Sequence, residues 1–347
     1  MSELRVGIVG LGWVAGAHIE AVQASRGARV HAVCSQRRPT PAAVAAHYGL
    51  ENPVVYGDYQ EMLADPDIDV VSLCSVNALH PSQAIAAIQA GKHVYIEKPI
   101  ALSQEQAKAI YDAWRGGRVK VCVGFECRFS QQLTLLKAVI DKGLIGDIHY
   151  GEADYYHGIG PWYGQFHWSC RRDGGGSSLL SGGCHALDAL LLAMDAPVLE
   201  VSSYASQSRA ECFREYEFPS CSVSILKFAD GKVGKVTSSV DCLQPYYFHF
   251  QFLGSKGSIL DNKFCSRALP GLSQDKWTTL ETVLLDSGDV LDHPYQPQFQ
   301  AFFDSIRNDS PMPLTGMEQA YQTHRVIFAA EKSLQLGRPV QMSEIPN

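Results

Sequence analysis

The sequence predicts an α/β protein whose N-terminal part is a doubly wound parallel sheet with helices on its faces. From residue 4 onward, short β-branched runs alternate with segments of helical period, which is typical of such a sheet. A glycine-rich turn follows the first run directly. Because crossovers between parallel strands are right-handed, the order of the elements nearly determines the topology. A chain of 347 residues most often forms two domains, so we expect a second domain after this sheet.

The elements of the first domain follow from their local patterns. Apolar, β-branched runs predict five strands, with the sequences RVGIVG (5–10), RVHAVC (29–34), DVVSLCS (69–75), HVYIEK (93–98) and KVCVGF (120–125). Helices are expected between them. The segment SQEQAKAIYDAW begins with Ser103 and Gln106 at the spacing of a capping box, which predicts a helix start at this point.

The composition excludes several classes of partner. The chain is 46% hydrophobic and 19% charged, as globular proteins are. Its net charge of −7 argues against a nucleic-acid or anionic-membrane surface, so we expect small molecules or other proteins as partners. No apolar run approaches the roughly 20 residues of a membrane-spanning helix. The N-terminus enters LRVGIVG without a signal-peptide pattern, which predicts a cytoplasmic protein.

The cysteines and histidines predict no metal site. None of the ten cysteines forms a C-x-x-C pair, and most lie in apolar runs, where they are expected to be buried free thiols. The 12 histidines show no H-E-x-x-H or comparable spacing.

The turn GLGWVAG, at 10–16, matches the dinucleotide-binding fingerprint of a Rossmann domain. Gly10 makes the tight turn, Gly12 lets a pyrophosphate approach the backbone, and the small Ala15 lets helix and strand pack closely. Its position after the first strand of a βαβ unit predicts nucleotide binding.

The end of the second strand bears on the choice of cofactor. The fingerprint expects a carboxylate here for the ribose 2′-hydroxyl, but this chain has Ser35, followed by Gln36, Arg37 and Arg38. A hydroxyl and two guanidiniums would bind a 2′-phosphate, which a carboxylate would repel. The sequence therefore favours NADP over NAD, the alternative being that both arginines are solvated loop charges.

The segment LLSGGCHALDALLLAMD, at 179–195, is an apolar helical stretch that carries one imidazole and one carboxylate. His185 and Asp188 are three residues apart, so they point into the same space on one helix face. This space is either a buried polar cluster or an active site.

Several motifs along the whole chain resemble the glucose-fructose oxidoreductase, inositol dehydrogenase and MocA (Gfo/Idh/MocA) family of sugar and polyol dehydrogenases. Beyond the glycine turn, they are VNALH (76–80), GKHVYIEKPIA (91–101), VGFECRFS (123–130), GLIGDI (143–148), GSKGSI (254–259), FQAFFDSIRN (299–308) and VIFAAEKSLQLGRPV (326–340).

The resemblance implies a fold for the second domain. It implies a Rossmann domain over 1–125 and, over 126–347, an α/β domain for substrate binding and oligomerisation. The latter would contain a large, mostly antiparallel sheet whose open face makes subunit contacts, giving a homodimer or homotetramer. Period-two segments agree with such a sheet, among them SCSVSILKFA (220–229), GKVGKVTSSV (231–240) and YYFHFQFLG (246–254).

The resemblance also assigns catalytic roles. Lys98 of the E-K-P motif would lie by the nicotinamide and the substrate hydroxyl, where its ammonium stabilises a developing alkoxide, and a cis peptide is expected before Pro99. His185 would be the general base and Asp188 the distal carboxylate. Ser181 stands where the family has an aspartate, so the negative charge would have to come from Asp188 or Asp173.

Residues 154–178 are rich in aromatic side chains, glycines and polar groups. Aromatic faces flanked by polar groups suit sugar rings, so we expect a substrate loop, the alternative being a structural or subunit-contact segment. The predicted substrate-binding residues are Lys98, Arg128, Tyr156, His157, Trp162, Trp168, Arg172 and His185. The predicted cofactor-binding residues are Gly10, Gly12, Trp13, Val14, Ala15, Ser35, Gln36, Arg37, Arg38, Ser75, Val76, Asn77, His80, Glu97 and Lys98.

Taken with the resemblance, these features predict an NAD(P)-dependent dehydrogenase. It would transfer a hydride between nicotinamide and a secondary alcohol of a sugar, glycoside or cyclitol, with a pyranoside C3 hydroxyl as the preferred expectation. The alternative is a non-catalytic, dinucleotide-sensing regulatory protein of the same fold. The presence of both Lys98 and His185 favours the enzyme, and Ser181 is the residue that keeps the alternative open.

Overall fold

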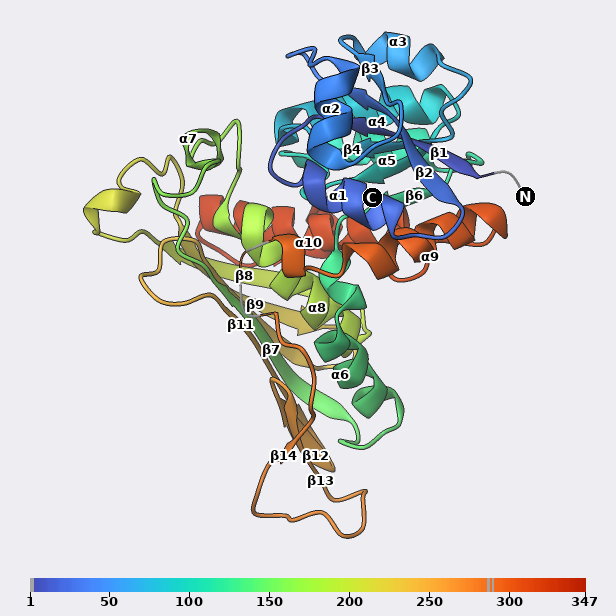
Figure 1. Ribbon diagram of the computed structural model, residues 1–347. Helices are drawn as coiled ribbons and strands as arrows, with labels where there is room; N and C mark the ends of the chain where they lie inside the picture. Colours follow the sequence, from blue (N-terminus) through green and yellow to red (C-terminus); the bar gives the residue numbers. More distant parts are fainter. Residues whose placement is uncertain (1–2, 286–287, 289) are drawn as a thin grey trace. The chain divides into compact units, whose positions relative to one another are not determined.

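The computed structural model describes residues 3–285, 288 and 290–347. The chain forms two compact units (Figure 1): the first comprises Met1–Glu126 and His293–Tyr321, and the second comprises Cys127–Asp292 and Gln322–Asn347. Each unit contains one sheet. Among the described residues, no helix has both the length and the apolar character that crossing a membrane requires.

The first unit has a parallel sheet, as the sequence predicts, and this sheet contains six strands. Their order across the sheet is β3-β2-β1-β4-β5-β6, the order of a doubly wound fold. The strands are β1 Leu4–Val9, β2 Ala28–Cys34, β3 Val54–Tyr56, β4 Val70–Leu73, β5 His93–Ile96 and β6 Val121–Val123. The sequence analysis missed β3. Strand β4 is buried at every position, as expected for a parallel sheet covered on both faces.

Helices connect these strands: α1 Ala15–Gln23, α2 Pro41–Tyr48, α3 Tyr59–Ala64, α4 His80–Gln89 and α5 Gln104–Trp114. Helix α5 begins where predicted, because the Ser103 hydroxyl accepts the Gln106 backbone N–H at 3.3 Å. The capping box forms only in part, since the Gln106 side chain accepts the N–H of Leu102 instead of that of Ser103.

Helix α9, Tyr295–Arg307, completes the first unit from a distant part of the sequence. It packs against α1, although the predicted division at residue 125 would assign it to the second domain. Its side chains Phe299, Phe302 and Phe303 are fully buried, at the spacing of one helix face. Tyr321, near the start of α10 (Met317–Leu336), stacks on Tyr111 of α5.

The second unit has a mixed, mostly antiparallel sheet of nine strands in the order β14-β13-β12-β11-β7-β10-β9-β8-β15. The pair β7 and β10 is parallel, and the other neighbouring pairs are antiparallel. The strands are β7 Ile148–Tyr156, β8 Val198–Ser206, β9 Cys221–Phe228, β10 Val233–Ser239, β11 Tyr247–Gly254, β12 Gly257–Leu260, β13 Lys263–Ser266, β14 Thr278–Thr279 and β15 Val340–Gln341.

Helices cover one face of this sheet. Figure 1 shows α6, Gln131–Asp141, and α8, Cys184–Met194, on the same side of it. On that face of the sheet, Gly151 and Gly234 leave room for Met194 and Leu190 of α8. A short helix, α7, spans Phe166–Ser169 within the aromatic segment.

The opposite face of the sheet carries charged and polar side chains at its centre. The ammonium of Lys235 lies 3.2 Å from a Glu152 oxygen and 2.7 Å from an Asp154 oxygen. The ring of His249 lies between carboxylates of Glu152 and Asp261, at 3.2 Å and 2.9 Å. This is the face that the sequence analysis expected to be open for subunit contacts, and its centre is charged.

Candidate active site

The glycine turn of the first unit has the geometry that a dinucleotide pyrophosphate requires. Gly10 has a φ of +86°, and a Cβ there would lie 2.8 Å from the carbonyl oxygen of Cys74. Only glycine fits this position without strain. Gly12 follows in the same turn, and the buried Ala15 begins α1. The first turn of α1 contains no acidic side chain, so the helix N-terminus is suited to an anion.

The loop after β2 exposes the residues predicted to select the cofactor. Gln36, Arg37 and Arg38 are exposed, and the Ser35 hydroxyl accepts the backbone N–H of Arg37 at 3.3 Å. Arg38 adopts a φ of +45°, and its guanidinium stem lies directly over Gly57, where a Cβ would collide with it. The loop therefore presents one hydroxyl and two guanidiniums, and one of these arginines, Arg38, packs against Gly57 just before α3.

The segment after β4 holds Ser75, Val76, Asn77 and His80 in different environments. Val76 is exposed, Asn77 is buried at the start of a short 3-10 helix, and the Ser75 hydroxyl donates to Gln83 at 2.5 Å. The His80 ring is fully buried, with Nδ1 2.8 Å from the Pro99 carbonyl oxygen and Nε2 3.0 Å from that of Ser75. Because both ring nitrogens face backbone carbonyls, His80 supports the cofactor loops and does not present a nitrogen to a nucleotide.

The E-K-P turn follows β5. The Lys98–Pro99 peptide bond is cis, as predicted. The Lys98 backbone N–H donates to Oε2 of Glu97 at 3.1 Å, and Oε1 of Glu97 lies 2.9 Å from Nε2 of His18. Glu97, predicted to bind the cofactor, is buried and has its carboxylate turned into the protein interior. It therefore supports the turn that carries Lys98.

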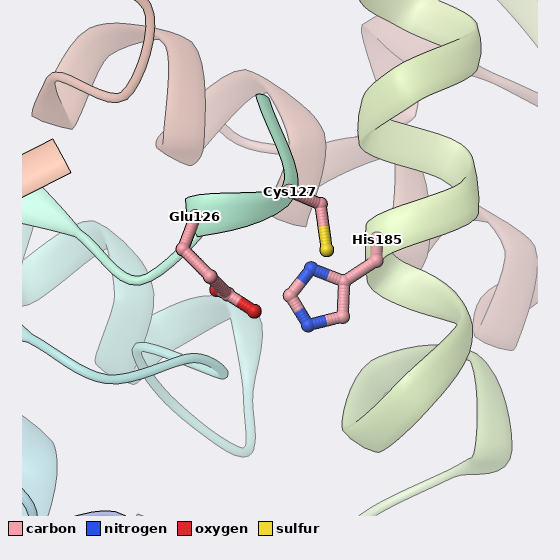
Figure 2. A group of neighbouring side chains, drawn as sticks. All are labelled: Glu126, Cys127 and His185. Atoms are coloured by element: carbon pink, nitrogen blue, oxygen red, sulfur yellow. The ribbon is translucent and has the colours of Figure 1, made fainter. Parts of the chain in front are cut away.

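In the second unit, His185 lies on α8 with a thiol beside it. Figure 2 shows the His185 ring and the Cys127 side chain, whose sulfur lies within 4.8 Å of a ring nitrogen; it also labels Glu126, the preceding residue of the chain. His185 and Cys127 are both buried. The Glu126 carboxylate is also 2.8 Å from Nδ1 of His293. Cys127 was not predicted as a site residue, although it lies within the VGFECRFS motif.

A π-helical turn, Leu179–Gly183, leads into α8, where the sequence predicted a continuous α-helix. Its glycines permit a close approach to the sheet, since a Cβ at Gly182 would lie 2.7 Å from the Tyr155 ring, and one at Gly183 would lie 2.4 Å from the Ser238 Cβ. Such turns are frequent at functional sites. Within the turn, the Ser181 hydroxyl donates to the Ser177 carbonyl at 3.0 Å.

Asp188 and Arg128 form a buried ion pair. The guanidinium of Arg128 donates to both Asp188 oxygens, at 2.5 Å from Nε and 2.7 Å from Nη2, and the Thr323 hydroxyl adds a bond of 2.8 Å. This bidentate geometry is the strong form of such a pair. Arg128 and Asp188 thus contact each other, whereas the sequence analysis expected Arg128 to bind substrate and Asp188 to act with His185; both expected roles stay predictions.

A different carboxyl group lies at the π-helical turn. Glu331 of α10 accepts the Ser177 hydroxyl at 2.5 Å, and Ser177 is the residue whose carbonyl binds Ser181. Burial raises the pKa of Glu331. Asp173, the alternative carboxylate predicted from sequence, is exposed beside Arg171. The sequence signal for Glu331 was weak, since it is a single charged residue in the C-terminal part of a long helix.

Aromatic side chains gather on the helix-covered side of the second sheet. The Tyr155 hydroxyl lies 3.1 Å from Nδ1 of His157, and the rings of Tyr163 and Tyr246 pack edge-on to His157 at 5.9 Å and 5.3 Å. Because neighbouring residues of a strand point to opposite faces, Tyr156 lies on the other face, where it stacks on Tyr247. Tyr155, and not Tyr156, therefore lies in this aromatic cluster.

The other predicted substrate residues lie along the aromatic segment. Trp162 is 62% exposed, and its indole N–H donates to the Gly158 carbonyl at 3.2 Å. Trp168 belongs to α7 and is partly buried, whereas Arg172 is exposed and donates its backbone N–H to Glu217.

The glycine turn and the two α/β units define a class of protein, the two-domain NAD-binding oxidoreductases. Residues 4–125 match a model described as an oxidoreductase family with an NAD-binding Rossmann fold, and residues 133–260 match the GFO/IDH/MocA C-terminal domain. The chain therefore belongs to the Gfo/Idh/MocA oxidoreductase family.

Known relatives carry names of sugar dehydrogenases. The chain is 26% identical to D-glucoside 3-dehydrogenase of Escherichia coli, over 98% of each chain. It is 37% identical to levoglucosan dehydrogenase of Pseudarthrobacter phenanthrenivorans over 43% of this chain and 40% of that one. A solved structure of levoglucosan dehydrogenase in complex with NADH covers 100% of both chains with a TM-score of 0.84 at 24% identity, a likeness of fold.

Proposed function

We propose that the protein is an NAD(P)-dependent dehydrogenase that transfers a hydride between nicotinamide and a secondary alcohol of a sugar, glycoside or cyclitol. The observation that carries the proposal is His185, an imidazole buried in an apolar helix that is entered through a π-helical turn. The names of the D-glucoside and levoglucosan dehydrogenases support the class of substrate. A pyranoside C3 hydroxyl is the substrate group that we favour.

The roles of the residues follow from their chemistry. When bound, the nicotinamide supplies the hydride acceptor, and the Gly10 turn provides space for its pyrophosphate. The Lys98 ammonium stabilises the alkoxide that develops on the substrate oxygen. The His185 imidazole takes the hydroxyl proton, because imidazoles commonly serve as general bases.

The second unit offers groups that suit a ring substrate. Tyr155, His157, Tyr163 and Tyr246 form a compact aromatic cluster, and aromatic faces pack on the C–H patches of sugar rings. Glu331 lies near the π-helical turn and replaces, in this proposal, the acidic group that Ser181 lacks. A cluster of this size favours a glycoside over a smaller free cyclitol.

A panel of sugars, glycosides and cyclitols tests the proposal. Purified protein is incubated with each compound and with NAD or NADP, while cofactor absorbance and product mass are followed. We expect reduced cofactor together with a product two mass units lighter than a glycoside substrate. Nucleotide binding without turnover on any compound would instead support the non-catalytic, dinucleotide-sensing protein.

The cofactor proposal is a preference for NADP. We expect calorimetry on nucleotide-free protein to give tighter binding of NADP than of NAD, because each phosphate–guanidinium contact contributes roughly 1.5–3 kcal/mol. The double variant Arg37→Ala/Arg38→Ala should abolish the difference, and Ser35→Asp should reverse it. Arg115→Ala, an exposed arginine at the end of α5, is the matched control. Equal affinity of the unmodified protein for both cofactors would show that the two arginines are solvated loop charges.

We also propose a homodimer or homotetramer assembled through the uncovered face of the second sheet. Around the charged centre, this face exposes Tyr204, Ile225 and Tyr247, at 75%, 42% and 42%. Exposed apolar side chains around a polar centre are typical of a contact surface. Sedimentation should show a dimer or tetramer at micromolar concentration and a smaller species for Ile225→Asp. A monomer of the unmodified protein under the same conditions would contradict the proposal.

A further inference from the structure

His18 is a buried imidazole that the proposed mechanism does not use. It lies on α1, the helix that the dinucleotide turn opens, and it is 0% exposed. Its Nδ1 lies 2.8 Å from the Ser72 hydroxyl of β4 and 3.2 Å from the Cys74 thiol. Its Nε2 lies 2.9 Å from Oε1 of Glu97. His18 therefore connects α1, the first helix of this unit, to β4 and to the end of β5.

The contact between His18 and Glu97 is a buried ion pair. Burial by itself would lower the pKa of His18, but Cys74 and Glu97 favour the charged form and raise it to about 10. Both ring nitrogens have polar partners, and these neighbours favour the charged form of the ring. A buried carboxylate without a polar partner is costly, and His18 supplies such a partner to Glu97.

Glu97 transmits this contact to the turn that carries Lys98. Its second oxygen accepts the Lys98 backbone N–H at 3.1 Å. The carboxylate also lies against Gly124, where a Cβ would approach it to 2.8 Å. On the far side of the turn, the Pro99 carbonyl contacts His80. The Lys98 backbone N–H is therefore held by the carboxylate that His18 contacts, and the carbonyl of the next residue, Pro99, contacts His80.

Aromatic rings enclose the imidazole of His18. The ring centroids of Tyr95, Tyr295 and Phe299 lie 4.8, 4.9 and 5.2 Å from that of His18. The titratable groups that face His18 are thus Glu97, Cys74, Tyr95 and Tyr295, and burial raises the pKa of Tyr95 well above its usual range. This apolar enclosure strengthens the attraction between the imidazolium and the carboxylate.

We propose that His18 is a positioning residue for the reaction, acting through Glu97 to fix the backbone of Lys98. It touches neither substrate nor nicotinamide in this role. The inference rests on the proposed function of Lys98 as the group that stabilises the alkoxide. In this role, His18, which follows the dinucleotide turn, connects that turn to Lys98.

The first test follows the position of Lys98 without any turnover. Reductive methylation with ¹³C-formaldehyde gives one NMR signal for each accessible lysine, and the Lys98 signal is the one that Lys98→Ala removes. We expect this signal to shift in His18→Gln and in Glu97→Gln. It should stay in place in Ser72→Ala, which loses a contact of the same ring but leaves Glu97 paired. An unchanged Lys98 signal in folded His18→Gln and Glu97→Gln proteins would overturn the proposal.

The second test is a double-mutant cycle on the substrate found in the panel. We expect His18→Gln to lower kcat about tenfold to a hundredfold, the usual range for a residue that orients a functional group, with little change in KM. In the Lys98→Ala background, the same substitution should have almost no further effect. A full effect of His18→Gln in that background would show that His18 does not act through Lys98. Normal turnover of Lys98→Ala alone would instead disprove the proposed role of Lys98.

Discussion

Replacing either Lys98 or His185 by alanine is expected to lower turnover by at least about a hundredfold while nucleotide affinity stays nearly unchanged. Loss of a proton-transfer group has this scale, and so does loss of a group that stabilises an oxyanion. Both variants are measured with the panel substrate, and nucleotide binding is measured separately by calorimetry. Since Lys98 follows a central strand of the first sheet and His185 lies on a helix of the second unit, the two losses report on separate parts of the fold.

Matched variants separate chemistry from general damage. His149→Ala removes an exposed imidazole of β7, and Lys108→Ala removes a partly exposed ammonium of α5 that pairs with Asp112. Both should retain normal turnover. If His185→Ala or Lys98→Ala retained near-normal turnover as well, the role assigned to that residue would be wrong.

The second large effect concerns stability and not turnover. Replacing Asp188 by asparagine, or Arg128 by methionine, should lower the free energy of unfolding by about 3–5 kcal/mol, because the remaining charge is left buried without its partner. Urea denaturation at neutral pH measures this change. The double variant Arg128→Met/Asp188→Leu should recover much of the loss, since both buried charges are then absent.

An exposed ion pair serves as the comparison. Arg338→Met breaks the contact with Glu344, where the arginine is half exposed, and it should leave the unfolding midpoint almost unchanged. A different outcome for Asp188→Asn would support the role of distal carboxylate that the sequence analysis expects for Asp188. If Asp188→Asn unfolded at the same urea concentration as the unmodified protein and yet lost turnover, Asp188 would be the distal carboxylate of a catalytic pair.

Features with local causes could be predicted from the sequence. Five of the six parallel strands have apolar runs of their own, and Gly10 has a sterically required position in a turn whose spacing is distinctive. Strand β3 escaped prediction because it has only three residues, Val54–Tyr56. The π-helical turn was not predicted because Gly182 and Gly183 also fit an ordinary α-helix.

The remaining misses depend on pairings between distant segments. The spacing of His185 and Asp188 correctly places both on α8, but Asp188 finds its partner in Arg128, 60 residues earlier in the chain. Tyr155 and Tyr156 are neighbours on one strand, and only the pairing of β7 with the rest of the sheet decides which of them faces the helices. Such choices are made by tertiary structure.

The position of α9 determines when the first unit can be completed. This unit needs Phe299, Phe302 and Phe303 for its core, and these residues leave the ribosome only after the whole nine-stranded sheet except its last strand. During synthesis, the α1 surface of residues 1–126 therefore stays uncovered while most of the second unit is made. A fragment that ends at residue 126 would keep the dinucleotide turn but would expose the apolar surface against which α9 packs.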